Sequence, residues 1–245
     1  VSTVIAQYVG AIWLVIIVKP HLLLGRRFSV QSAVVRDLLR VGGDLGVRVF
    51  SMLAIFTAST VLAARSGDAV LAAHQIVNGT FLLLALCLDA ISIPAHTLLG
   101  ESRGSGHLNL QRRVSGRVYF WSGVLGGVLA IIIFASAQVL PSLFTADESV
   151  KLAATDGLRF LAIALIPGAI AFAGDGVLIG LSDSRFLGLA AFAHTAIMAL
   201  ALFSESIRTG PGLSGIWALL VLWMIMRALT VTARSRALLR QPKMA

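Results

Sequence analysis

The sequence predicts an all-α integral membrane protein, built as a helical bundle of about seven transmembrane helices. Hydrophobic residues make up 58% of the 245-residue chain and charged residues only 13%, which reverses the balance that a soluble domain needs at its surface. The apolar residues form long uncharged runs rather than amphipathic stripes. Helices are the expected spans, because alternation at period two is absent and every backbone polar group in lipid must be bonded within its own segment.

Each uncharged run is close to the roughly 20 residues that cross a hydrocarbon core of about 30 Å. In chain order the predicted spans are Val1 to Val18, Val49 to Ala64, Ala69 to Leu88, Val118 to Ala146, Phe160 to Gly174, Phe186 to Ser204 and Thr209 to Met226. Pro141 lies near the outer end of its span. Pro167 lies inside its span, where a proline removes one backbone hydrogen bond, so we expect a kink in that helix.

The lysines and arginines between the spans predict the orientation of the bundle. Fourteen of them lie in alternate gaps or in the C-terminal tail: Lys19, Arg26, Arg27, Arg36, Arg40, Arg103, Arg112, Arg113, Arg117, Arg185, Arg234, Arg236, Arg240 and Lys243. The other gaps hold only four, Arg65, Lys151, Arg159 and Arg208. We therefore expect a multi-pass protein of the cell (plasma) membrane with a cytoplasmic C-terminus, and with Val1 outside.

The segment between the first two spans is predicted to lie at the membrane surface. Residues Phe28 to Val41 place apolar valines and leucines beside charged residues, which is typical of a short amphipathic helix in the headgroup region. Gly42 and Gly43 are expected to turn the chain into the membrane. The chain starts with apolar residues, with no basic segment before them, which suggests that it begins inside a transmembrane helix and belongs to a longer protein.

Small residues recur at a spacing of four and are expected to let helices approach closely. The three pairs are Gly42 with Gly46, Gly123 with Gly127, and Gly176 with Gly180. Helix packing is the favoured interpretation, and a mobile hinge is the alternative.

Four charged residues, Asp44, Arg48, Asp89 and Asp175, lie within the spans or at their ends. Each would cost about 2.5 to 3.5 kcal/mol if it faced lipid at a helix centre, so each should face the bundle interior or a water-filled cavity. Asp44 and Arg48 are one helical turn apart and can pair, either as a structural ion pair or as part of ion coupling. Asp175 lies between two glycines that leave the backbone accessible.

A polar stripe is predicted along the third span. At 100° per residue, His74, Asn78, Asp89 and His96 fall within an arc of about 60° on an otherwise apolar helix. Such a stripe can line a cavity, and the two histidines can equally lie at the two membrane interfaces. Asp89 is either a proton-titrating, cavity-lining carboxylate or a buried structural acceptor, and the same alternatives hold for Asp175.

The sequence contains no catalytic or metal-binding motif that we can identify. No cofactor is expected, and the single cysteine, Cys87, excludes a disulfide framework and a cysteine-based metal site. Although the net charge is +9, the basic residues lie in the short gaps between spans rather than on one face. Nucleic acid is therefore not an expected partner.

Four stretches resemble the multidrug and toxic compound extrusion (MATE) family, in particular its DNA-damage-inducible protein F branch. They are Gly42-Gly-Asp-Leu-Gly-Val-Arg48, Leu71-Ala-Ala-His-Gln75, Leu86-Cys-Leu-Asp-Ala90 and Asp175-Gly-Val-Leu-Ile-Gly-Leu-Ser-Asp-Ser-Arg-Phe186. The resemblance implies four parts: residues 1–18 as the last helix of an N-lobe, 19–43 as a connector, 44–236 as a six-helix C-lobe and 237–245 as a cytoplasmic tail. The candidate substrate or ion residues are Asp44, Arg48, His74, Gln75, Asn78, Asp89 and Asp175.

The family exports organic cations and other amphipathic compounds by alternating access between two six-helix lobes, driven by protons or sodium ions. The partners so implied are the lipid bilayer, small amphipathic or cationic substrates and the missing N-lobe helices. Two positions that are acidic in the sodium-coupled branch correspond to the uncharged Val49 and Gly168 here. The best-known coupling carboxylate of the resembled branch lies on the first helix, which this chain lacks. Proton coupling through the missing lobe is therefore expected, and sodium is the alternative coupling ion.

Two other functions remain as alternatives. A lipid-linked oligosaccharide or lipid flippase of the same superfamily should hold a pyrophosphate with several arginines or lysines, and Arg48 is the only basic residue that we place well within a span. An intramembrane enzyme would need a nucleophile with a base or a set of metal ligands, for which His74 with Asp89 is a weak constellation.

Overall fold

The computed structural model describes residues 2–22, 32–202, 204 and 212–240. These residues are almost entirely helical and include no strand, so the predicted all-α membrane fold is confirmed. Val1–Arg40 and Val41–Ala245 form two compact units, and the second contains most of the chain. Several residues used in the sequence predictions lie outside the described residues, namely Arg26, Arg27, Phe28 to Gln31, Arg208 and Lys243.

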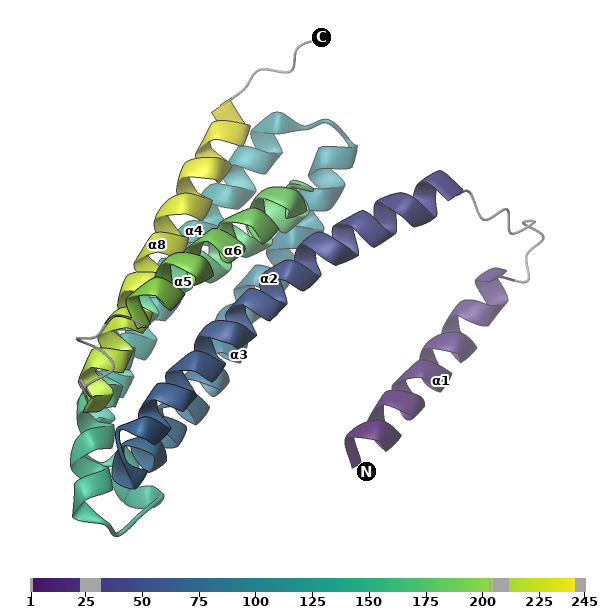
Figure 1. Cartoon of the computed structure of the whole chain (residues 1–245). Coiled ribbons are helices and arrows are strands. Elements are labelled where there is room, and N and C mark those ends of the chain that lie inside the picture. The colour runs from purple at the N-terminus through teal and green to yellow at the C-terminus, as the bar shows by residue number, and fades with distance from the viewer. Residues whose placement is uncertain (1, 23–31, 203, 205–211, 241–245) are drawn as a thin grey trace. The chain divides into compact units, whose positions relative to one another are not determined.

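The helices follow one another along the chain (Figure 1). Their bounds are α1 Ser2–Leu22, α2 Ser32–Arg65, α3 Asp68–Gly104, α4 Leu108–Ser136, the short 3-10 helix η1 Leu140–Leu143, α5 Glu148–Gly180, α6 Ser184–Leu202 and α8 Gly212–Arg240. Among the described residues, six helices are long and apolar enough to cross a membrane, namely α2, α3, α4, α5, α6 and α8. Within α1, the stretch Val4–Ile17 is apolar but shorter.

The predictions for the helices around Gly42 and Pro141 are wrong. Helix α2 runs without a break from Ser32 through Gly42 and Gly43 to Arg65, so the two glycines do not turn the chain. A glycine costs only about 1 kcal/mol in a helix interior, which a long apolar helix can absorb. The predicted span that included Pro141 ends at Ser136, and Pro141 instead lies at the start of η1, where a missing amide proton costs nothing.

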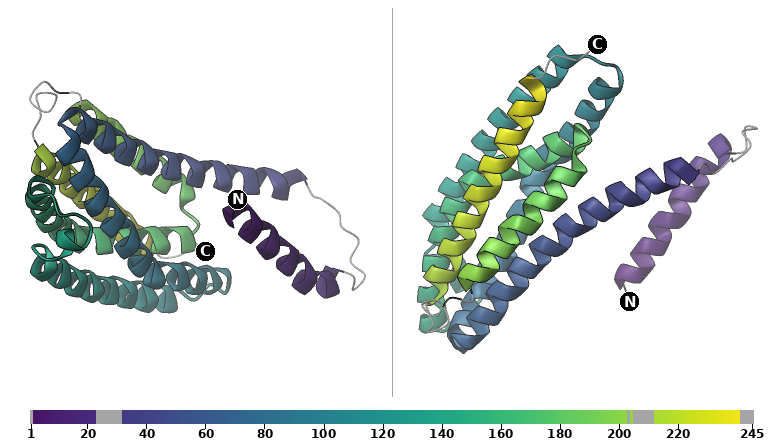
Figure 2. Two further views of the ribbon diagram at one scale, coloured as in Figure 1. Left: turned by 90° about the horizontal axis from the view of Figure 1, so that it is seen from below. Right: turned by 45° about the horizontal axis from the view of Figure 1, so that its top comes forward.

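Helix α5 is the centre of the larger unit. It contacts α3, α4 and α8 extensively and buries far more of its apolar stretch than any other span (Figures 1 and 2). Pro167, which is predicted to kink this helix, lies inside an unbroken run of helical residues. The largest core cluster includes Phe81 of α3, Leu158 of α5 and Trp217 of α8.

Glycine–backbone contacts explain how α5 fits so closely against α3. A Cβ atom on Gly176 would lie 2.6 Å from the backbone oxygen of Ser92, and one on Gly180 would lie 2.7 Å from the backbone oxygen of His96. Real Cβ atoms do not approach so closely, so packing is confirmed as the role of this pair. No atom approaches within 4 Å of a Cβ at Gly42, Gly46 or Gly127, so the other two predicted pairs do not form such contacts with the described residues.

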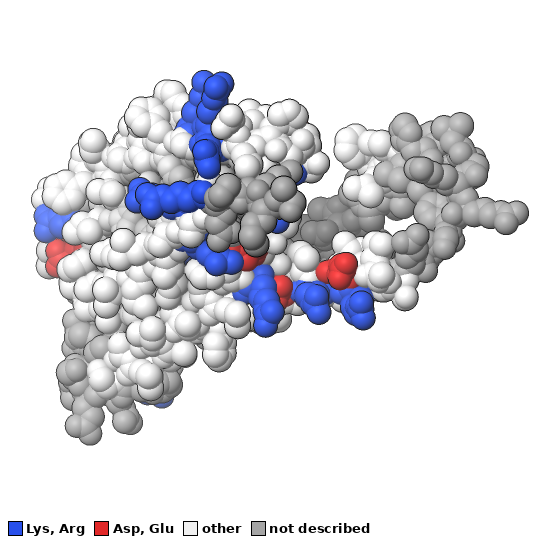
Figure 3. Space-filling view, turned by 90° about the horizontal axis from the view of Figure 1, so that it is seen from above, with Lys and Arg blue, Asp and Glu red and all other residues white. Residues whose placement is uncertain are grey.

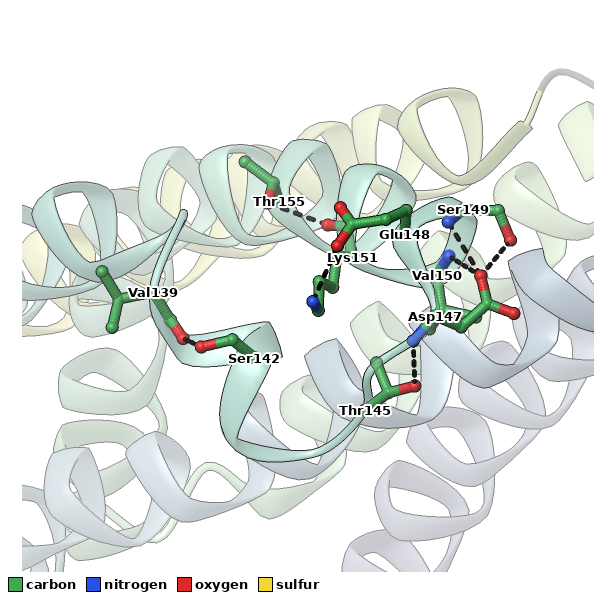
Figure 4. Close-up of polar contacts among 9 residues, drawn as sticks. All are labelled: Val139, Ser142, Thr145, Asp147, Glu148, Ser149, Val150, Lys151 and Thr155. Carbon is green, nitrogen blue, oxygen red and sulfur yellow. Dashed lines mark hydrogen bonds and ion pairs between the residues drawn. The ribbon is translucent and has the colours of Figure 1, made fainter.

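Asp147 begins α5 as its N-cap (Figure 4). Its Oδ1 atom accepts hydrogen bonds from the Ser149 backbone amide at 2.8 Å and from the Ser149 hydroxyl at 2.6 Å. The Val150 amide donates to the same oxygen at 3.3 Å. These bonds satisfy amide groups that have no partner within the helix.

We expect the contribution of Asp147 to depend on pH. Hydrogen bonds from the Ser149 hydroxyl and from the Val150 and Ser149 amides lower the pKa of the Asp147 carboxyl below its ordinary value of 3.8. Since the carboxyl has the lower pKa in the folded state, its stabilisation of the fold is complete above pH 3.8. The stabilisation is lost as the pH falls through the lowered pKa of the folded state. Thermal unfolding of Asp147→Ala should show a lower midpoint at neutral pH, by a small amount because the carboxylate is exposed, and a smaller difference in strong acid, where the carboxyl keeps an acceptor oxygen but loses its charge.

Asp147→Asn is the matched control, because an asparagine at this position keeps an acceptor but does not titrate. Its midpoint should exceed that of Asp147→Ala at all pH values. A difference between wild type and Asp147→Ala that did not change with pH would contradict the assignment of the pH dependence to this carboxyl.

Candidate functional site

An ion cluster in the bundle interior brings together three helices. Asp175 of α5 is bound by Arg48 of α2 and by Arg227 of α8, and both guanidinium groups contact the same carboxylate oxygen, Oδ2. The Arg227 Nη2 atom lies 2.7 Å from that oxygen. The side chains of Asp175 and Arg227 are each 5% exposed and that of Arg48 is 18% exposed. Charges buried to this extent are stable only when they are paired, so the cluster constrains how α2, α5 and α8 are arranged.

Aromatic side chains complete the surroundings of Arg227. Its guanidinium carbon lies 4.8 Å from the ring centroid of Trp223 and 5.6 Å from that of Phe172. A guanidinium over an aromatic face is attracted by the ring electrons, and its weak hydration suits a buried position. The Arg227 side chain is thus held by a carboxylate and two aromatic rings within an otherwise apolar region.

Asp89 of α3 adds a fourth charge. It is half-buried and interacts electrostatically with Arg48, Arg227 and Asp175. The four groups carry two positive and two negative charges when all are ionised, so their sum is zero. Arg48, Asp89 and Arg227 lie near the middle of α2, α3 and α8, where a membrane protein keeps an ionisable group for a structural or functional reason. We call these four residues the charge cluster.

The predicted pairing of Asp44 with Arg48 is wrong. Arg48 binds Asp175 instead, and Asp44 Oδ2 accepts a hydrogen bond of 3.1 Å from the hydroxyl of Ser184 at the start of α6. The backbone of Asp44 also packs against Gly188 of α6, where a Cβ atom would lie 2.7 Å from the Asp44 carbonyl oxygen. Asp44 therefore connects α2 to α6 rather than to the charge cluster.

The predicted stripe on α3 divides into separate environments. His74 is fully buried, its Nε2 atom lies 3.3 Å from Thr60 Oγ1, and its ring lies 6.0 Å from that of Trp217. Asn78 and His96 are half-buried, whereas Gln75 is exposed. His74 and Asp89 are separated by fifteen residues of helix, or about 22 Å, so they cannot form one catalytic site. Only Asp89 of the stripe belongs to the charge cluster.

Arg227 is the residue that the sequence analysis missed. The last predicted span ends at Met226 because the next residue is charged, whereas α8 continues to Arg240. A signal is present, since Ala228, Leu229 and Val231 continue the apolar pattern beyond the arginine. The prediction that Arg48 is the only basic residue well within a span is therefore wrong.

Arg234 forms a second ion pair near the end of α8. Its Nε atom lies 2.6 Å from Asp183 Oδ2, and its guanidinium lies 5.0 Å from the ring of Phe186. This pair is more exposed than the charge cluster. Within the described part of the chain, no group of three or more histidine, cysteine or acidic side chains is arranged to hold a metal ion.

Comparison with known proteins decides the family. The family model described as MatE matches residues 45–203, which include most of the larger unit. The chain belongs to the MATE family. The predicted family is thus confirmed, and the predicted branch within it stays a prediction. MATE proteins and their solved structures are transporters rather than enzymes.

Plant and bacterial MATE proteins are similar to most of this chain. Protein DETOXIFICATION 44, chloroplastic, of Arabidopsis thaliana is 32% identical over 92% of the chain and 43% of its own length. A probable multidrug resistance protein NorM of Deinococcus radiodurans is 27% identical over 82% of the chain and 46% of its own length. A solved MOP superfamily transporter from Pyrococcus furiosus has the same fold, with a TM-score of 0.78 and 17% identity over 86% of this chain and 48% of that one. The chain spans about half the length of each of these proteins.

Proposed function

We propose that this chain is the C-terminal lobe, together with one preceding helix, of a secondary transporter that exports amphipathic or cationic compounds in exchange for protons. The MATE family membership and the coverage of about half of each relative support this proposal. A second six-helix lobe would face this one, and the two would alternate between inward and outward openings. We further propose the cell membrane as its location, with the basic end of the bundle in the cytoplasm.

The observation that carries the proposal is the charge cluster. Asp175 Oδ2 already accepts two charge-assisted contacts, whereas the half-buried Asp89 has only electrostatic interactions with the others. We therefore assign the exchangeable proton to Asp89. A proton on Asp89 would change the charge of the cluster from zero to +1, and a positive cluster repels an organic cation. Proton and cation would thus exclude each other, which is the requirement for exchange.

The paired state of the two arginines argues against a phosphate-carrying flippase. Such a site needs guanidinium groups that are available to a pyrophosphate. Arg48 and Arg227 both contact Asp175, so the second buried arginine does not supply that site. Exchange of a cation for a proton remains the function that this geometry supports best, and sodium remains the alternative coupling ion.

The test is efflux of a fluorescent organic cation from everted vesicles that contain the intact transporter. Asp89→Asn should reduce export driven by a pH gradient by about tenfold or more, which corresponds to a lost interaction of about 1.4 kcal/mol. Asp89→Glu should retain part of the activity because it keeps the carboxyl. Cys87→Ser, at an exposed position of the same helix, is the control and should export normally.

Each outcome has a definite meaning for the coupling ion. Export by wild type under a sodium gradient alone, with no response to a pH gradient, would show that sodium rather than protons is the coupling ion. Normal pH-driven export by Asp89→Asn, at normal protein levels, would contradict the assignment of the proton to Asp89.

A further inference from the structure

A pocket separate from the charge cluster lies between α4 and α8. Its volume is about 420 Å³, and Ile170 of α5 contributes to its lining. Three arginines, Arg112, Arg236 and Arg240, line it together with several hydroxyl groups. Its location is the end of the bundle at which α4 begins and α8 finishes, and Figure 3 shows basic side chains gathered on this side of the molecule.

The three arginines bring three positive charges to the lining of the pocket. None of them forms an ion pair with an acidic side chain of the described residues, whereas Arg234 on the same helix is paired with Asp183. The Nε atom of Arg112 donates to the backbone oxygen of Leu239 at 2.8 Å. This bond orients the Arg112 guanidinium at the end of α8.

Hydroxyl groups lie inside the same pocket. Tyr119 and Ser235 are hydrogen-bonded to each other at 2.8 Å, which connects α4 to α8. Ser115 is 3% exposed, and its Oγ atom has no hydrogen-bond partner among the described residues. A buried hydroxyl usually has a partner, so an unpartnered one in the lining of a pocket indicates that a ligand or water completes it.

The helix dipoles do not create this positive field. The N-terminal part of α4 favours an anion and the C-terminal part of α8 disfavours one, so the two effects oppose each other. The guanidinium groups therefore determine the preference of the pocket. Their planar arrangement of N–H groups matches the oxygens of a phosphate, to which arginine can donate two hydrogen bonds at once.

We propose that this pocket binds the phosphate headgroup of an anionic phospholipid. A lipid headgroup and a soluble phosphate compound present the same phosphate group to the arginines, but two observations favour a lipid. Ile170 and Leu239 give the pocket an apolar portion beside the arginines, which suits the start of an acyl chain. The pocket also lies at the basic end of long apolar helices, where lipid headgroups meet a membrane protein.

The experiment measures how lipids protect the intact, delipidated protein in detergent against thermal unfolding. Phosphatidylglycerol should raise the unfolding midpoint of wild type, and phosphatidylcholine, which has no net charge, should raise it much less. The Arg236→Gln, Arg240→Gln double variant should bind phosphatidylglycerol about tenfold more weakly, since each basic group near an anionic lipid contributes to binding. Arg103→Gln, Arg117→Gln changes the net charge equally at exposed positions outside the pocket and should bind normally.

Two results would overturn the proposal. Equal loss of binding in both double variants would show that the general charge of this end, rather than the pocket, attracts the lipid. Equal protection by inorganic phosphate and by phosphatidylglycerol would show that the site serves a soluble phosphate group. If the glutamine variant does not fold, Arg236→Lys, Arg240→Lys replaces it in the experiment. Weaker binding of phosphatidylglycerol by the lysine variant, at unchanged net charge, would support recognition of the phosphate by arginine in this pocket. Unchanged binding would overturn that recognition.

Discussion

Asp175→Asn is expected to lower the free energy of unfolding by about 3 to 5 kcal/mol, because it removes the one carboxylate that both guanidinium groups contact directly. Arg227 is 5% exposed and Arg48 18% exposed at the side chain, so water cannot solvate either group adequately. The asparagine amide oxygen can still accept a hydrogen bond, but it carries no charge. The measurement is denaturant unfolding of the purified protein in mixed micelles, followed by tryptophan fluorescence.

Asp183→Asn is the matched control for this substitution. It breaks the pair with Arg234, whose side chain is 41% exposed, and should cost no more than about 1 kcal/mol. Equal losses of unfolding free energy in Asp175→Asn and Asp183→Asn would contradict the burial of the charge cluster.

A triple variant separates stability from transport. Asp175→Leu with Arg48→Met and Arg227→Met removes the three charges that are in direct contact and leaves Asp89 in place, and such replacements of buried ion groups are often neutral or stabilising. We expect this variant to fold and to lose cation export, which would show that the charges serve transport. A triple variant that exported normally would remove Arg48, Asp175 and Arg227 from the proposed mechanism.

Gly176→Val is expected to destabilise the contact between α3 and α5 by about 3 kcal/mol, at the upper end of the usual cost of overpacking. Even the first added carbon would lie 2.6 Å from both the backbone oxygen and the hydroxyl of Ser92. The Ser92 hydroxyl donates to the Phe172 backbone oxygen at 2.9 Å, so displacing it would also disturb a buried hydrogen bond. After extraction from the membrane, the amount of folded protein in size-exclusion chromatography and the midpoint of thermal unfolding should both fall markedly.

Gly127→Val is the matched control, because no neighbouring atom lies within 4 Å of a Cβ at that position. Its midpoint should equal or slightly exceed that of wild type, since glycine is a poor residue for a helix interior. Similar losses in both variants would show that the two substitutions act through general effects on helices rather than through the close approach at Ser92.

The sequence by itself determined the class of the protein, the approximate spans and the residues most costly to bury. Long uncharged runs are a local property, and a charge within such a run is visible without knowing its partner. For this reason Arg48, Asp89 and Asp175 are recognisable as interior candidates from the sequence. The four family stretches likewise lie within short windows of the chain.

The tertiary structure alone decided which charges meet. Arg48 and Asp175 are 127 residues apart, so no local spacing predicts their contact, and the spacing that is visible favours Asp44 instead. Arg227 is missed when a charge is read as the end of a span, although a buried partner allows the helix to continue through it. The same physical reason underlies both results, since pairing across helices sets whether a membrane tolerates a charge, and that pairing is a property of the packed bundle.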